Sequence, residues 1–588
     1  MTQPTSGLLP ALIGYYHRLA DDLDQQVPVA DFGFSEEKIH FCLVLEPDGN
    51  LFEFQDIRDR TDKGKPIPKT MLVPDSGGRA GSGMKPFFCW DNTGYAIGRD
   101  NKDNPKRAAE MFAAFRDLHL TFRDELADDE GFQALCRFLE RWEPDRAEEL
   151  PDWKEAAGSN LVFRLRSRTG YVHQSEAVKS AWSRRVSAKE SEPPVIGVSL
   201  VDGAEGELAR LHPQFGGVIG ANTSGAALVS FNLNAFESYG KSQSYNAPVG
   251  TRDAFRYGTA LNRLLADRAR RIPIGDATVV FWSDRASAAD AEEAFQEIFG
   301  EDASVRESAE SAPTLDRVRS FLEAARQGRL ADQIRDPDAP FYVLGLSPNA
   351  ARLNVRFWLT GTVADFAKHL VDHVDQLEMV GARPDDPPLA IRRLIRETAR
   401  EPKEIAPQLA GEVARAVLAG LPYPQALFIA IVRRVRIDGE MNHRRAAVLK
   451  AYLIRNRRKG VPVALDKERP DESYQLGRLL AALEKTQEDA TEGKLNATIK
   501  DKFFGAAAAT PASVFPRLLR LHQHHLNKLA NEGLRINREK LVGEICGRVL
   551  RFPSHLPLEQ QGLFYIGYYH QRQDFFAKKT ENQETTDE

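Results

Sequence analysis

The segment RPDDPP, from Arg383 to Pro388, separates two parts of the sequence that differ in periodicity. Before it, short apolar and alternating runs predict β-strands interspersed with helical patterns. After it, apolar residues recur at helical spacing almost to the end of the chain. We therefore predict an α+β fold: a mixed α/β N-terminal region with irregular basic loops, followed by an all-α C-terminal helical bundle.

Two hairpins are expected upstream of this boundary. Near the N-terminus, IHFCLVLE and LFEFQDI flank the turn Pro47-Asp48-Gly49-Asn50. Further along, FYVLGLS and ARLNVRFWL are joined through Pro348 and Asn349 and lead into a helix expected from Thr362 to about Met379. Downstream, KGVPVALDKERPDESY, from Lys459 to Tyr474, interrupts the helical pattern and predicts a second break.

These breaks predict five segments, because 588 residues exceed what one hydrophobic core usually organises. They are a mixed α/β region with a long basic loop at 1–195, a strand-rich α/β region with a polar loop at 196–383, a basic helical region at 384–460, a C-terminal helical bundle at 461–580, and a disordered tail at 581–588.

Composition is that of an ordinary globular protein, with 42% hydrophobic and 28% charged residues and a net charge of −5. No apolar run approaches the roughly 20 residues that span a bilayer, and the N-terminus lacks a secretory pattern, so we expect no membrane partner and a cytoplasmic location. Four cysteines lie too far apart in sequence to suggest a zinc or redox pair.

A polar loop follows at GGVIGANTSGAALVSFNLNAFESYGKSQSYNAP, from Gly216 to Pro248. Its glycines permit close backbone approach, and its amides, hydroxyls and lysine can contact base edges or phosphates. A polar structural loop is the alternative interpretation. The residues expected to bind are Asn222, Ser224, Gly225, Lys241, Gln243 and Asn246.

The same loop contains AFESYGKS, from Ala235 to Ser242, which fits a loose phosphate-loop pattern with Asp284 as a possible magnesium partner. A nucleotide hydrolase is therefore the enzyme alternative. Such a loop must open onto a helix, however, and Pro248 and Gly250 occupy the expected first turns. Because no other motif nominates a nucleophile, we expect no catalytic residue and no cofactor.

Basic residues gather in two further places. Between Leu389 and Gly460 there are 16 Lys and Arg against six Asp and Glu, an excess suited to neutralising phosphates. A solvated helix surface is the alternative there. The residues expected to track a nucleic-acid backbone are Arg433, Arg434, Arg436, Arg444, Arg445, Arg457, Arg458 and Lys459.

The second basic place is the N-terminal loop, where Lys69, Lys85 and Asn92 are expected to contact DNA. Aromatic residues nearby could stack on bases, although such residues more often belong to a core: Phe87, Phe88, Trp90 and Tyr95. His369 and His373 lie four apart on an expected helix, but without a third ligand we expect no metal site.

Several strings together resemble one family. They include IGYYHRLA, KTMLVP, MKPFFCWDNTGYAIG, GSNLVFRL, GANTSGAALVSFNLNAFESYGKSQSYNAPV, LGLSPNAARLNVRFW, NATIKDKFFGAAAATPASVFPRLL and QGLFYIGYYHQ. From about residue 8 to about residue 576, the chain resembles the large subunit of the type I-C CRISPR surveillance complex (Cascade), called Csd-one or Cas-eight-c.

The resemblance implies a non-catalytic subunit that recognises the protospacer-adjacent motif in duplex DNA, promotes guide RNA pairing (R-loop formation) and helps recruit the Cas-three helicase-nuclease. A purely structural scaffold of the complex is an alternative. The implied partners are guide CRISPR RNA, target DNA, the Cascade backbone and handle-binding subunits, and Cas-three.

The resemblance further implies a small subunit made separately from the C-terminal region by internal translation. Because the last methionine is Met441, a product that begins near Val461 or Val463 would need a non-methionine start codon.

Overall fold

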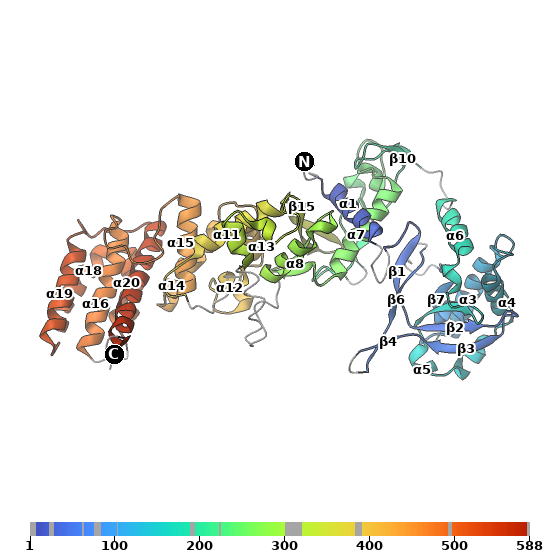
Figure 1. Ribbon diagram of the computed structural model, residues 1–588, viewed down its shortest axis with the longest axis horizontal. Coiled ribbons are helices and arrows are strands. Elements are labelled where there is room, and N and C mark those ends of the chain that lie inside the picture. Colours follow the sequence, from blue (N-terminus) through green and yellow to red (C-terminus); the bar gives the residue numbers. More distant parts are fainter. Residues whose placement is uncertain are drawn as a thin grey trace. The chain divides into compact units, whose positions relative to one another are not determined.

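The computed structural model describes residues 7–22, 29–61, 64–75, 84–102, 104–188, 195–222, 225–299, 320–382, 391–491 and 497–584. These residues form two compact units, and Figure 1 shows the chain coloured along its sequence. Unit 1 comprises Met1–Ala11, Gln214–Leu228 and Asn262–Glu588, and unit 2 comprises Leu12–Pro213 and Val229–Leu261. The α+β class is confirmed. The five expected segments remain a prediction, and the expected boundary at Arg383–Pro388 lies outside the described residues.

A four-stranded sheet with the order β3-β2-β8-β7 organises unit 2 (Figure 1). The expected N-terminal hairpin is confirmed as an antiparallel pair, and β2 also pairs with β8 in parallel. Along β2, alternate side chains enter two different cores, so all five residues are buried. The strand bounds are β2 Phe41–Leu45, β3 Leu51–Asp56, β7 Trp90–Asn92 and β8 Asn160–Leu165.

Helices α3 and α4 pack on one face of this sheet, where the rings of Phe115 and Phe138 each lie with their centroids 6.1 Å from that of Phe163. The opposite face is covered by the antiparallel ribbon β1–β6 through Ile39, Met71 and Val73. The other bounds are α1 Leu8–Asp21, β1 Phe34–Ile39, β4 Asp59–Arg60, β5 Pro66–Ile67, β6 Lys69–Pro74, α2 Thr93–Ala96, α3 Pro105–Leu120, α4 Glu130–Arg141, α5 Trp153–Ala156, α6 Glu176–Ala188, β9 Ile196–Val198 and β10 Glu205–Glu207.

Unit 1 contains a six-stranded sheet with the order β11-β12-β16-β15-β14-β13. The expected second hairpin is confirmed, because β15 and β16 pair down to Asn349 and Arg352. The following helix, α11, begins after Thr362, whose hydroxyl accepts a hydrogen bond from the Asp365 backbone in a capping box. The bounds are β11 Gln214–Phe215, β12 Ala226–Ala227, β13 Arg271–Ile274, β14 Ala277–Trp282, β15 Pro340–Asn349, β16 Arg352–Thr362 and α11 Val363–Leu377.

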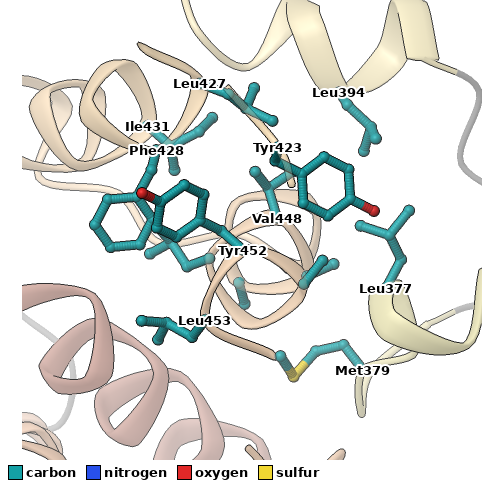
Figure 2. Close-up of a cluster of buried hydrophobic side chains, with 14 of the residues drawn as sticks. Leu377, Met379, Leu394, Tyr423, Leu427, Phe428, Ile431, Val448, Tyr452 and Leu453 are labelled. Carbon is teal, nitrogen blue, oxygen red and sulfur yellow. The ribbon is translucent and has the colours of Figure 1, made fainter. Parts of the chain in front are cut away.

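One continuous hydrophobic core runs from the sheet of unit 1 into its helices, from Ile272 to Tyr569. Figure 2 shows part of it, where Phe428 and Tyr452 stack with ring centroids 4.4 Å apart. The remaining bounds are α7 Thr251–Ala266, α8 Ala289–Phe299, α12 Ile391–Arg396, α13 Pro407–Leu418, α14 Gln425–Asp438, α15 His443–Arg457, α16 Glu472–Ala490, α17 Ile499–Ala509, α18 Pro511–Leu526, α19 Glu532–Cys546 and α20 Leu558–Glu584.

The last helix extends to Glu584, into the polar stretch for which we expected a disordered tail, and residues 585–588 lie outside the described part of the chain. Helices α16 and α20 pack side by side (Figure 1), and at Gly477 and Gly567 the backbone of one helix comes into direct contact with the backbone of the other. A β-carbon on Gly477 would overlap the carbonyl of Phe564, and one on Gly567 would overlap the carbonyl of Tyr474. Glycine at both positions therefore permits the close packing of this helix pair.

Over the described ranges, we find no helix with the length and apolar character needed to cross a membrane.

Candidate nucleic-acid interface

The tetrapeptide Ser238–Lys241 in unit 2 forms a tight, exposed turn. Both central residues have positive φ, 54° at Tyr239 and 69° at Gly240, and the backbone N–H of Lys241 donates to the Ser238 carbonyl at 3.0 Å. These are the features of a type I′ turn, which costs little at glycine but is unusual for tyrosine. The Tyr239 side chain is 99% exposed, and Lys241 beside it is exposed as well. The turn therefore presents an aromatic ring and an ammonium group to solvent.

The side chain of Asn246 fixes the backbone of this turn through three hydrogen bonds. Its Oδ1 accepts from the Ser238 N–H at 2.8 Å, and its Nδ2 donates to the carbonyls of Lys241 and Gln243 at 2.8 and 2.9 Å. Asn246, predicted as a base-contacting residue, thus has both ends of its amide engaged in the loop. The structure gives it a bracing role, and a direct DNA contact remains a prediction.

Gln243 belongs to the same brace. Its side-chain oxygen accepts from Arg210 Nη1 at 3.0 Å, and its backbone N–H donates to Glu237 Oε1 at 3.1 Å. Sequence reasoning missed both Arg210, because it lies 33 residues away, and Tyr239. The Ser-Tyr-Gly-Lys order was the available signal for Tyr239, since a glycine after an exposed residue suits a two-residue turn.

The phosphate-loop alternative does not fit this geometry. Lys241 is followed by a short 3₁₀ turn at Gln243–Asn246, and the next α-helix begins only at Thr251. A phosphate loop needs a helix N-terminus directly after its lysine.

Asn222 and Gly225 lie in unit 1, in the connection between β11 and β12. The Gly225 N–H donates to the Asn222 carbonyl at 3.0 Å, and Gly225 has a φ of 97°, which favours glycine. Asn222 is exposed, Gly225 is buried, and Ser224 lies outside the described residues. The expected polar loop is therefore divided between the two units.

The N-terminal candidates differ from one another in accessibility. Lys69 is exposed at the start of β6, and Lys85 is half-buried, its backbone N–H donating to the Tyr95 hydroxyl at 3.3 Å. Asn92 caps α2, its Oδ1 accepting from Gly94 and Tyr95. The nearby aromatic residues are core: Phe88, Trp90 and Tyr95 are buried, and Phe87 stacks on Trp90.

The arginine-rich helices contain cations that are already neutralised. Arg445 is only 7% exposed and pairs with Glu397 at 3.1 Å and Asp438 at 2.7 Å. The other pairs are Arg434–Asp438 at 2.5 Å, Arg444–Glu397 at 3.6 Å and Arg457–Glu559 at 2.5 Å. The excess of basic over acidic residues therefore does not leave these arginines without carboxylates, because the fold pairs them with Glu397 and Asp438 of the same region and with Glu559 of α20.

Of the eight basic residues expected to contact a nucleic-acid backbone, four have no carboxylate partner among the described residues: Arg433, Arg436, Arg458 and Lys459. Arg433, Arg436 and Arg458 are exposed and Lys459 is half-buried. Arg458 ends α15 in the left-handed conformation with a φ of 52°. These four of the eight basic residues are the ones that remain available to a phosphate backbone.

The two histidines of α11 make separate, structural hydrogen bonds. His369 Nδ1 lies 2.8 Å from the Leu418 carbonyl, and His373 Nδ1 lies 2.6 Å from the Tyr423 hydroxyl. Burial lowers the pKa of His373 to about 3, with a further contribution from the neighbouring Arg455. His373 is therefore neutral at physiological pH and acts as a packing residue of the unit 1 core.

The braced turn thus places an exposed ring and an exposed ammonium side by side. A family model described as CRISPR-associated protein (Cas_Csd1) matches residues 12–576. The chain therefore belongs to the Csd1 family, the large subunits of the type I-C Cascade complex, and the resemblance found in the sequence is confirmed. A search among curated proteins found no match.

Membership in this family makes the chain a structural subunit of Cascade, which assembles with other subunits and with guide CRISPR RNA.

Proposed function

We propose that this subunit recognises the protospacer-adjacent motif in duplex DNA, promotes guide RNA pairing and R-loop formation, and helps recruit the Cas-three helicase-nuclease. The observation that carries DNA recognition is the braced turn Ser238–Lys241, with its fully exposed Tyr239 ring. We also propose that the complex acts in the cytoplasm.

The turn suits this task because its two exposed groups serve different purposes. An aromatic ring can enter a base step, and because the cost of opening a step depends on its sequence, this contact can favour one motif over another. Stacking of the ring on a base contributes about 1 to 3 kcal/mol. The Lys241 ammonium can contact a phosphate, which gives affinity without sequence choice. Since the Asn246 amide already fixes the backbone of the turn, little backbone conformational entropy is lost when the turn binds DNA.

Few protein contacts to bases are needed, because base pairing with the guide RNA reads the target itself. Around the turn, we propose that Asn222, Ser224, Gly225, Gln243 and Asn246 line or support the motif-binding surface and that Lys69, Lys85 and Asn92 contribute from the N-terminal region. Of the arginine-rich helices, we propose Arg433, Arg436, Arg458 and Lys459 as contacts to a nucleic-acid backbone.

The test replaces the ring in the assembled, guide-loaded complex. We expect Tyr239→Ala to weaken binding to target duplex with a permitted motif by about 1 to 3 kcal/mol. Tyr239→Phe, which keeps the ring, is the matched control and should bind like the wild type. Equal motif discrimination by the wild type and Tyr239→Ala would show that the Tyr239 ring does not read the motif.

We further propose that a separate small subunit begins near Val461 or Val463 and comprises α16–α20. In the full chain this bundle shares its core with α14 and α15, since Phe428 packs closely against Gly562 of α20. A free bundle would expose that apolar face and would need another Cascade subunit to cover it. Intact mass spectrometry of the purified complex should find the product, and its absence would refute the proposal.

A further inference from the structure

The hairpin β9–β10 of unit 2 presents an apolar edge at Ile196 and Val198, and the edge ends at Leu200, whose backbone N–H donates to the Pro248 carbonyl at 2.9 Å. Its side chains on and beside β9 are unusually exposed for their type, with 58% at Ile196, 57% at Val198 and 72% at Leu200. Single exposed apolar residues are ordinary, but three within five positions on one strand edge are not. The hairpin therefore exposes a contiguous apolar strip.

The backbone of the same strand is open on its outer side. The Leu208 N–H donates to the Val195 carbonyl and the Ser199 N–H to the Ala204 carbonyl, both at 2.9 Å. Because bonded pairs alternate in an antiparallel ladder, the N–H and C=O groups of Ile196 and Val198 point away from β10. Among the described residues none bonds to these outward groups, so β9 is an unpaired edge.

Charge distinguishes this hairpin from a nucleic-acid surface. From Val195 to Leu208 the sequence contains three carboxylates, at Asp202, Glu205 and Glu207, and no lysine or arginine. All three also line a cavity of about 520 Å³ beside β10, whose other charged lining residues are Arg252, Asp253 and Arg256 of α7, with Arg256 paired to Asp253 at 3.1 Å. The carboxylates of the hairpin itself would repel a phosphate backbone and attract basic side chains of a protein.

We propose that β9 is a docking edge for another protein subunit of Cascade, which adds an extended strand beside Ile196 and Val198. The added strand would carry apolar side chains that face Ile196, Val198 and Leu200, and basic side chains that reach Asp202 or Glu205. Strand addition gives affinity through main-chain hydrogen bonds and specificity through alternate side chains. It also protects an edge that would otherwise promote aggregation. This inference is independent of the proposed DNA recognition.

The test places a photo-crosslinking benzoylphenylalanine at Val198 or at Leu200 in complex assembled without target DNA. Leu550, which is 90% exposed after α19, is the control position. We expect both hairpin positions to link to a single segment of one other protein subunit, rich in apolar and basic residues, and the control to give no such product. Links to RNA, links to a second copy of this chain, or no link would each overturn the proposal.

Two substitutions measure how much the β9 edge contributes to retention of the chain in the complex. Val198→Pro removes only an outward N–H and is tolerated on an edge strand, and Ile196→Lys leaves the backbone unchanged. Val198→Pro should weaken retention of the chain in the complex by about tenfold, the factor that one or two backbone hydrogen bonds supply. Ile196→Lys should weaken it by about the same factor, because it removes an apolar contact and adds a charge that repels a basic strand. Leu550→Lys should have no effect. Wild-type retention by Ile196→Lys would contradict the proposal even if Val198→Pro failed to fold.

Discussion

The turn at Ser238–Lys241 and the arginine-rich helices α14 and α15 both looked suited to nucleic acid, but they use their charges differently. In the turn, one lysine stands exposed beside an exposed ring. In the helices, Arg445 and Arg434 share Asp438, and Arg455 lies over the Tyr423 ring at 4.3 Å. The density of arginines along a sequence therefore predicts phosphate binding poorly, because what matters is which cations the fold leaves accessible.

The largest expected effect tests whether the helix arginines are structural. Arg445→Ala removes the buried guanidinium that bridges Glu397 and Asp438, which then keep only Arg444 and Arg434 as partners, and should lower the free energy of unfolding by about 3 kcal/mol. Urea unfolding measures this change. The matched control is Arg433→Ala, at an exposed position on the same helical pair, for which we expect a change within about 0.5 kcal/mol. A small effect at Arg445 would mean that this arginine is available to a ligand.

The helical region should also respond to added volume. Gly477→Ala forces a methyl group into the backbone of α20 and should destabilise unit 1 by about 3 kcal/mol. Gly543→Ala on α19 meets no atom within 4 Å and should be neutral or stabilising by up to about 1 kcal/mol. Thermal unfolding of both variants compares them, and equal melting temperatures would contradict the close helix crossing.

Acid should weaken the packed core through its neutral histidines. The pKa of His373 is lowered from 6.5 to about 3 in the folded state, so the unfolded chain takes up a proton first as pH falls. The contribution of His373 to the free energy of unfolding is constant above pH 6.5. Below that pH it declines, by about 2 kcal/mol between pH 6.5 and pH 5. Urea unfolding at the two pH values should show a smaller loss in His373→Gln than in the wild type. An identical loss would show that His373 is not held neutral.

The smallest expected effect belongs to the exposed lysine. Lys241→Ala should weaken DNA binding to permitted and scrambled motifs alike and reduce the slope of log affinity against log salt by about 1. Titrations at several salt concentrations measure this slope. An unchanged slope would place Lys241 away from any phosphate.

Local features were predictable from the sequence where neighbours along the chain decide the structure. The hairpin β15–β16 and the start of α11 at Thr362 follow from alternation, turn residues and a cap. The long-range arginine pairs were not predictable, since Glu397 lies 48 residues from Arg445 and Glu559 lies 102 residues from Arg457. The exposure of Tyr239 was hidden for a similar reason, because it depends on a brace that Asn246 completes.

The most direct measurement is binding of the guide-loaded complex to matched duplexes with a permitted or a scrambled adjacent motif, at fixed salt. The wild type is compared with Tyr239→Ala/Lys241→Ala and with Arg433→Ala/Arg436→Ala. We predict that the turn variant loses discrimination between motifs, while the arginine variant binds both duplexes more weakly but still discriminates. Discrimination that survives in the turn variant and disappears in the arginine variant would contradict the account.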